Sequence, residues 1–119
     1  MSRECTMFWN SIKEIDSVTL AGWLDEKASS FRIIDVRQHQ EIAMGTVPGA
    51  EALPLHLLPL KLNEIDKSET IVLVCRSGAR SGQATAFMQQ QGFENVYNLR
   101  GGMMGWTASG LPAPAPAAT

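Results

Sequence analysis

The chain has 119 residues, 45% of them hydrophobic, and a formal net charge of −2 at pH 7. This length can bury one continuous core but leaves no room for a second domain of ordinary size. The small negative charge gives no general attraction for nucleic acid or for an anionic membrane surface. No apolar run is long enough to span a bilayer, and the N-terminus lacks the apolar core of a signal peptide, so we expect a cytoplasmic protein.

The first half of the chain predicts helices alternating with short strands. Its expected elements are helices over 18–24 and 38–44 and strands over 31–36 and around 52–53. The clearest helical signal is the spacing of Leu20, Trp23 and Leu24 behind Ser17, a suitable N-cap. The apolar segment 56–66 fits either a broken helix or a loop over the sheet, because Pro59 excludes a long regular helix.

The second half contains a strongly apolar strand, 70–74, which shows no polar alternation after Thr70. Such a strand is typical of a parallel sheet covered on both faces. A helix is expected to open at Ser81 and to end before Gly92, followed by a strand over 96–99 and a short helix that carries Trp106. Strands that alternate with helices predict a parallel sheet with helices on both faces.

Cys75 lies between the apolar strand and the following helix, where parallel sheets bind ligands. The backbone N–H groups of residues 76–80 precede or open that helix and can converge on the sulfur, and the helix dipole adds positive potential. Arg76 and Arg80 add two formal charges, while Ser77 and Ser81 can donate hydrogen bonds. Gly78 allows the tight turn, and Ala79 completes the loop. These features predict a reactive thiolate at Cys75, where a core thiol is the alternative.

The loop 75–81, Cys-Arg-Ser-Gly-Ala-Arg-Ser, resembles the active loop of the rhodanese-like family, sulfurtransferases that carry a persulfide on this cysteine. Segments 33–37 and 45–50, with Glu41, resemble the family's upstream signature, and 99–102 and 110–112, with Trp106, resemble its C-terminal one. The resemblance implies about five strands in one doubly wound sheet. It predicts a domain over 15–112, an N-terminal extension over 1–14 and a flexible Pro/Ala-rich tail over 113–119. Thr46 stands where the family usually has a histidine.

Loop length separates two related chemistries. Cys75 and Arg80 have four residues between them, whereas cysteine phosphatases of related fold have five and so a wider cradle. The resemblance therefore implies a sulfurtransferase that takes sulfur from an anionic donor such as thiosulfate and gives it to cyanide or a thiol. Two alternatives remain open: a sulfur-relay or interaction module that receives persulfide from a partner protein, and an arsenate or phosphate-ester enzyme.

Other polar residues receive structural interpretations. Asp35, Arg37 and Glu41 gather near a strand end, where such groups form paired networks that fix loops; Arg37 can add positive potential to the site. His39 and His56 lack the spacing and companions of a metal site. No glycine-rich fingerprint supports a nucleotide cofactor. Cys5 lies outside any motif, so neither a disulfide with Cys75 nor a relay role is assigned to it.

Overall fold

The computed structural model describes residues 12–26 and 30–115, so Cys5 and most of the predicted N-terminal extension lie outside it. Its centre is a five-stranded sheet in which every pairing is parallel, with the order β1-β5-β4-β2-β3. The strands are β1 (Lys13–Ile15), β2 (Arg32–Asp35), β3 (Glu51–Ala52), β4 (Ile71–Val74) and β5 (Val96–Leu99). The predicted α/β class and the number of strands are confirmed.

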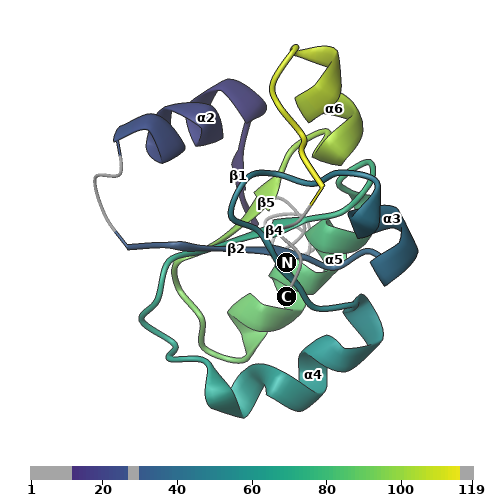
Figure 1. Ribbon diagram of the computed structural model, residues 1–119. Coiled ribbons are helices and arrows are strands. Elements are labelled where there is room, and N and C mark those ends of the chain that lie inside the picture. Colours follow the sequence, from purple (N-terminus) through teal and green to yellow (C-terminus); the bar gives the residue numbers. More distant parts are fainter. Residues whose placement is uncertain (1–11, 27–29, 116–119) are drawn as a thin grey trace, which may run out of the picture.

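Helices cover both faces of this sheet (Figure 1). They are α2 (Ser17–Glu26), α3 (His39–Ala43), α4 (Leu58–Lys61), α5 (Ala79–Gln90) and α6 (Gly102–Ala108). Helices α2 and α6 lie side by side on one face, and α4 and α5 lie on the other. The segment 56–66 is a broken helix: short 3₁₀ turns, Leu55–Leu57 and Leu62–Glu64, flank α4, whose first turn accommodates Pro59.

Strand β4 lies in the middle of the sheet and all four of its side chains are fully buried. Ile71 and Leu73 face the core under α5, whereas Val72 and Val74 face the core under α2 and α6. Both faces of the strand are therefore covered, which is the physical reason why its sequence shows no polar alternation. The central position also places the carboxyl end of β4 between the ends of two neighbouring strands.

Strand β1 was not predicted from the sequence. It pairs with β5 at the edge of the sheet, and only Ile15 of its three residues is buried. So short and exposed a strand shows no alternation of apolar and polar residues in the sequence. Because β1 begins at Lys13, the sheet starts two residues before residue 15, the predicted start of the domain. At the other end, the Pro114 carbonyl accepts a hydrogen bond from the Thr46 N–H at 3.1 Å, so the start of the predicted tail packs on the domain.

Helix α5 begins at Ala79, two residues earlier than the sequence suggested. Gly78 precedes it with φ of +96°, a left-handed conformation that glycine adopts without steric cost. The early start puts Arg80 in the first turn of the helix rather than at the end of the preceding loop. It also brings the N–H of Ser81, in the same first turn, toward the carboxyl end of β4.

Candidate active site at the end of the central strand

Cys75 follows β4 directly, and only 4% of its surface is exposed. Its Sγ atom accepts three hydrogen bonds from the start of α5. The N–H groups of Gly78 and Ser81 lie at 3.0 and 3.4 Å, and the Ser81 hydroxyl lies at 3.2 Å. Donors of this kind have no partner within their own helix, because the first turn of a helix leaves its N–H groups free. The site therefore presents one sulfur atom to a converging set of hydrogen-bond donors.

Two opposing effects set the pKa of the Cys75 thiol. Burial is the largest single effect and raises the pKa, because it disfavours the charged thiolate. Hydrogen bonds from the Ser81 hydroxyl and from the N–H groups of Ser81, Gly78 and Ser77 act in the other direction. Together they outweigh burial, and the pKa lies below its usual value. The anion is thus stabilised chiefly by hydrogen bonds at short range.

The structure distributes the predicted loop residues unevenly around the sulfur. Gly78 and Ser81 lie closest to Sγ, as described above, and the Ser77 N–H also stabilises the thiolate, although Ser77 and Ala79 are themselves exposed. The side chains of Arg76 and Arg80 are also exposed, and within residues 12–26 and 30–115 neither has a hydrogen-bond or ion-pair partner. By its place at the end of the loop in the sequence, Arg80 is expected to hold the ring of N–H donors and its potential together, but within the same residues no hydrogen bond or ion pair of its side chain supports that role. Both guanidinium groups remain available to an anion that approaches from solvent.

The start of α6 supports the loop from behind. The N–H of Met103 donates to the Cys75 carbonyl and the N–H of Met104 donates to the Arg76 carbonyl, both at 2.9 Å. Gly102 lies so close to this backbone that a β-carbon there would be 2.5 Å from the Cys75 carbonyl oxygen. This close approach explains the glycine at position 102, the first residue of α6, because it allows the helix to dock on the cysteine loop.

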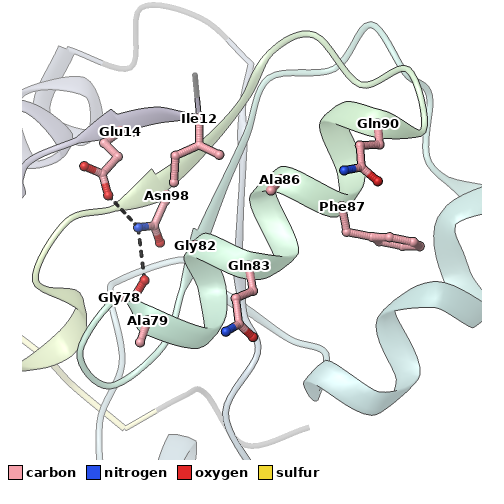
Figure 2. A pocket seen from close by; sticks show the side chains of 10 residues that line it. All are labelled: Ile12, Glu14, Gly78, Ala79, Gly82, Gln83, Ala86, Phe87, Gln90 and Asn98. Atoms are coloured by element: carbon pink, nitrogen blue, oxygen red, sulfur yellow. Dashed lines mark hydrogen bonds between the residues drawn. The ribbon is translucent and has the colours of Figure 1, made fainter. Parts of the chain in front are cut away.

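A polar network that the sequence did not reveal continues from Ser81 to the edge of the sheet. The Ser81 hydroxyl lies 2.5 Å from Asn98 Oδ1. The Nδ2 group of Asn98 donates to the Glu14 carboxylate at 2.9 Å and to the Gly78 carbonyl at 3.1 Å, as Figure 2 shows. Asn98 is buried in the middle of β5. A single polar residue in an otherwise apolar strand was the available sequence signal for this network.

Asp35 and Arg37 form a second network, beside the site rather than within it. Asp35 is fully buried at the end of β2, and its carboxylate accepts hydrogen bonds from the Arg37 guanidinium and from the Thr46 hydroxyl at 2.6 Å. Arg37 also donates to the Gly45 carbonyl at 2.7 Å. Glu41 accepts from the Gln38 N–H at the start of α3. These contacts favour the structural interpretation, and they show that Thr46 satisfies a buried carboxylate.

Hollows lie on two sides of the loop. A depression of about 330 Å³ is lined by Arg37 and Arg76 together with methionines of α6 and of the turn after α3. A larger groove of about 560 Å³ runs along α5. Figure 2 shows that Glu14 and Asn98 face this groove from β1 and β5, and that Gly78 and Ala79 form its end. The Cys75 loop therefore separates two concave surfaces.

The part of the chain that the structure describes contains no cluster of three or more side chains suited to hold a metal ion. His39 lies exposed at the start of α3 and His56 lies exposed in a 3₁₀ turn. Within the same described residues, no helix has the length and apolar character needed to cross a membrane.

Comparison with known proteins agrees with this geometry. Residues 19–109 match the rhodanese-like domain family, and the chain belongs to that family. It is similar to a solved structure, a rhodanese-like domain protein from Staphylococcus aureus, with 33% sequence identity and a TM-score of 0.74 over 80% of this chain and 91% of that one. The fold and the matched residues thus identify a rhodanese-like domain of the sulfurtransferase family.

Three relatives bear on what such a domain does. A sulfurtransferase from Allochromatium vinosum is 46% identical over 88% of this chain and 97% of its own length. A thiosulfate sulfurtransferase (GlpE) from Pseudoalteromonas translucida is 34% identical over 65% of this chain and 73% of its own. The Bacillus subtilis protein named "Putative sulfur carrier protein YrkF" is 35% identical over 82% of this chain but only 52% of its own length.

Proposed function

We propose that this protein transfers sulfane sulfur through a persulfide on Cys75, from an anionic donor such as thiosulfate to a thiophilic acceptor. The observation that carries the proposal is the convergence of Gly78 and Ser81 donors on the Cys75 Sγ atom at 3.0–3.4 Å. A thiolate stabilised in this way is the nucleophilic form of cysteine. The thiosulfate sulfurtransferase among the relatives supports thiosulfate as the donor.

The reaction proceeds in two displacements. In the first, the Cys75 thiolate attacks the outer sulfur of thiosulfate, a new S–S bond forms at Sγ, and sulfite leaves with the electron pair of the broken S–S bond. In the second, the acceptor attacks the outer sulfur of the persulfide, and Cys75 departs as a thiolate. Each half leaves a covalent intermediate or the free enzyme, so ping-pong kinetics are expected. The loop N–H groups stabilise the anionic sulfur in both halves, much as an oxyanion hole stabilises oxygen.

The cramped surroundings of Sγ favour sulfur over phosphate as the transferred group. Only 4% of Cys75 is exposed, and the loop has four residues between Cys75 and Arg80, which suits a single terminal atom better than a tetrahedral phosphate. A phosphate-ester or arsenate enzyme is therefore the weaker proposal. Hydrolysis of an aryl phosphate that disappears in Cys75→Ser would restore it.

The direct test is whether Cys75 takes up a sulfur atom to form a persulfide, which is called loading below. Incubation with thiosulfate should raise the intact mass by one sulfur atom, and Cys75→Ser should show no gain. Cyanide and low-molecular-weight thiols, added in turn to the loaded protein, should each remove the sulfur if they are acceptors. A gain that persists in Cys75→Ser, or no gain with any sulfane donor, would contradict the proposal.

A sulfur-relay role is the second candidate, and the relative named as a sulfur carrier favours it. In this role a partner protein supplies the persulfide and another removes it, while thiosulfate reacts slowly. The two candidates differ in the rate of Cys75 loading. Rapid loading by a persulfidated protein donor, together with slow loading by thiosulfate at saturation, would select the relay. Faster loading by thiosulfate would select the enzyme.

A further inference from the structure

The Ser81 hydroxyl stands between two acceptors. Its oxygen lies 2.5 Å from Asn98 Oδ1 and 3.2 Å from Cys75 Sγ. A hydroxyl carries one proton, so it can donate to only one of them at a time. The orientation of the Asn98 amide is fixed independently, because its nitrogen faces two acceptors, the Glu14 carboxylate and the Gly78 carbonyl. The amide oxygen must therefore face Ser81.

We infer that Asn98 competes with the Cys75 sulfur for the single hydroxyl proton of Ser81, and that Asn98 is thereby a positioning residue for the nucleophile. In the thiol state, the Cys75 S–H donates to the Ser81 oxygen and Ser81 donates to Asn98, so every group is satisfied. In the thiolate state, Ser81 turns its proton to the sulfur. Asn98 Oδ1 then has no other donor among the described residues, although Asn98 is only 2% exposed.

An unsatisfied buried amide oxygen has a free-energy cost. Ionisation of Cys75 therefore gains one hydrogen bond from Ser81 and sacrifices another, at Asn98. The consequence is that Asn98 weakens the net stabilisation that Ser81 gives to the thiolate. A cysteine whose anion is stabilised too strongly is a poor nucleophile, because nucleophilicity falls with the pKa. The competition keeps the sulfur ionisable and also reactive.

The same competition affects the covalent intermediate, and this step rests on the proposed function. When the persulfide forms, the negative charge moves from Sγ to the outer sulfur, and Sγ becomes a weak acceptor. The Ser81 proton can then return to Asn98 Oδ1 and restore that hydrogen bond. Asn98 consequently favours the loaded protein over the free thiolate, and its removal should slow loading at a pH where Cys75 is fully ionised.

Charged groups on the surrounding elements must be considered before any change in Cys75 is assigned to Asn98. They are Glu14 on β1, Asp35 and Arg37 at the end of β2, Glu41 on α3, Arg76 and Arg80 on the loop and α5, and Arg100 after β5. Within the described part of the chain, none of them has a hydrogen bond to Cys75 Sγ or to Ser81 Oγ. All of them are retained when Asn98 is replaced.

The test is a double-mutant cycle on the pKa of Cys75. Asn98→Ala and Asn98→Leu are made with Ser81 present and with Ser81→Ala. The pKa is taken from the pH dependence of alkylation by iodoacetamide, read on the Cys75 peptide by mass spectrometry so that Cys5 does not contribute. We expect both Asn98 variants to lower the pKa by roughly half to one pH unit when Ser81 is present. We expect no change from either when residue 81 is alanine.

The two replacements guard against a packing effect, because alanine leaves a small cavity and leucine fills it. An unchanged or higher pKa in the presence of Ser81 would overturn the inference. So would an equal change in the Ser81→Ala background, because Asn98 would then act on the loop through the Gly78 carbonyl or Glu14 and not through Ser81. Alkylation needs no sulfur donor, so this result does not depend on whether the protein proves to be a sulfurtransferase.

Discussion

Gly102 and Cys75 are in contact through their backbones: a β-carbon on Gly102 would stand 2.5 Å from the Cys75 carbonyl oxygen. Gly102 also has φ of +57°, a conformation that other residues adopt only with strain. The contact is accompanied by the hydrogen bond from the Met103 N–H to the same carbonyl. The start of α6 and the cysteine loop therefore form one packed unit. A substitution in either one should alter the conformation of the other.

Gly102→Ala should disturb both stability and sulfur loading. Steric contact with the Cys75 carbonyl and the strained backbone should together lower the free energy of unfolding by about 1–3 kcal/mol. The displaced loop should also slow persulfide formation. Urea denaturation and mass spectrometry measure the two effects. Gly22→Ala is the matched control, since a β-carbon there meets nothing within 4 Å and the position is helical; it should be neutral or stabilising. Equal losses in the two variants would contradict the argument.

Thr46→Val should destabilise the protein because it removes the hydroxyl that donates to Asp35 at 2.6 Å. Valine has nearly the same shape, so the loss of the hydrogen bond to a fully buried carboxylate dominates. We expect the free energy of unfolding to fall by about 1–3 kcal/mol, measured by urea denaturation. Thr46→Ser keeps the hydroxyl and should retain most of the stability. If serine cost as much as valine, the methyl group and not the hydrogen bond would be responsible.

The central strand and its cysteine loop could be predicted because their signals are local. The apolar run before Cys75 reports burial on both faces, and the glycine and serine residues after it report a turn into a helix. Local signals fix these features to within two residues, as the early start of α5 shows. The same signals overstated the contribution of Arg76 and Arg80 to stabilising the thiolate. Both are close to Cys75 in sequence, but their side chains are exposed to solvent.

The Asn98 network could not be predicted because it depends on a strand pairing between distant segments. Glu14 and Asn98 are aligned partners in the β1–β5 register, and 84 positions separate them. Strand β1 is too short and too exposed to show a pattern, so nothing in the sequence places Glu14 beside β5. Thr46 illustrates the same limit: the sequence marks it as unusual, but only the fold brings its hydroxyl to Asp35.

The lowered pKa of Cys75 makes the stability of the fold depend on pH in a defined direction. Between the folded pKa and the unfolded pKa of about 8.5, the unfolded chain binds a proton that the folded protein does not. Stability from this group is therefore fully present above the unfolded pKa and is lost as the pH falls through the folded pKa.

The free energy of unfolding of the wild type minus that of Cys75→Ala should thus rise as the pH increases from the folded pKa toward the unfolded pKa of about 8.5 and level off above it, with a slope of at most about 1.4 kcal/mol per pH unit. Denaturation under reducing conditions across this range measures it, and the subtraction removes the contributions of other titrating groups. A difference that stays flat would mean that the thiol ionises equally in both states. A difference that falls with pH would mean that burial, not hydrogen bonding, dominates.

The Arg76 side chain is exposed, and its guanidinium has no hydrogen-bond or ion-pair partner among the described residues, so its charge should act on incoming ligands rather than on the fold. Arg76→Ala should leave the free energy of unfolding within about 0.5 kcal/mol of the wild type. It should raise the KM for thiosulfate several-fold with a smaller change in kcat, and the effect should shrink as salt screens the charge. Arg80→Ala is expected to behave in the same way, since Arg80 is equally exposed at the start of α5.

Alkylation separates this electrostatic role from any effect on the nucleophile. Iodoacetate is anionic and iodoacetamide is neutral, so the ratio of their rates at Cys75 reports the local potential, whereas a change in thiolate reactivity alters both rates together. Arg76→Ala should lower that ratio. Lys61→Ala removes the same charge from α4, outside the residues that line either hollow beside the loop, and should leave the ratio unchanged. If both variants lowered it equally, the attraction would come from net charge, and Arg76 would have no special place at the mouth of the site.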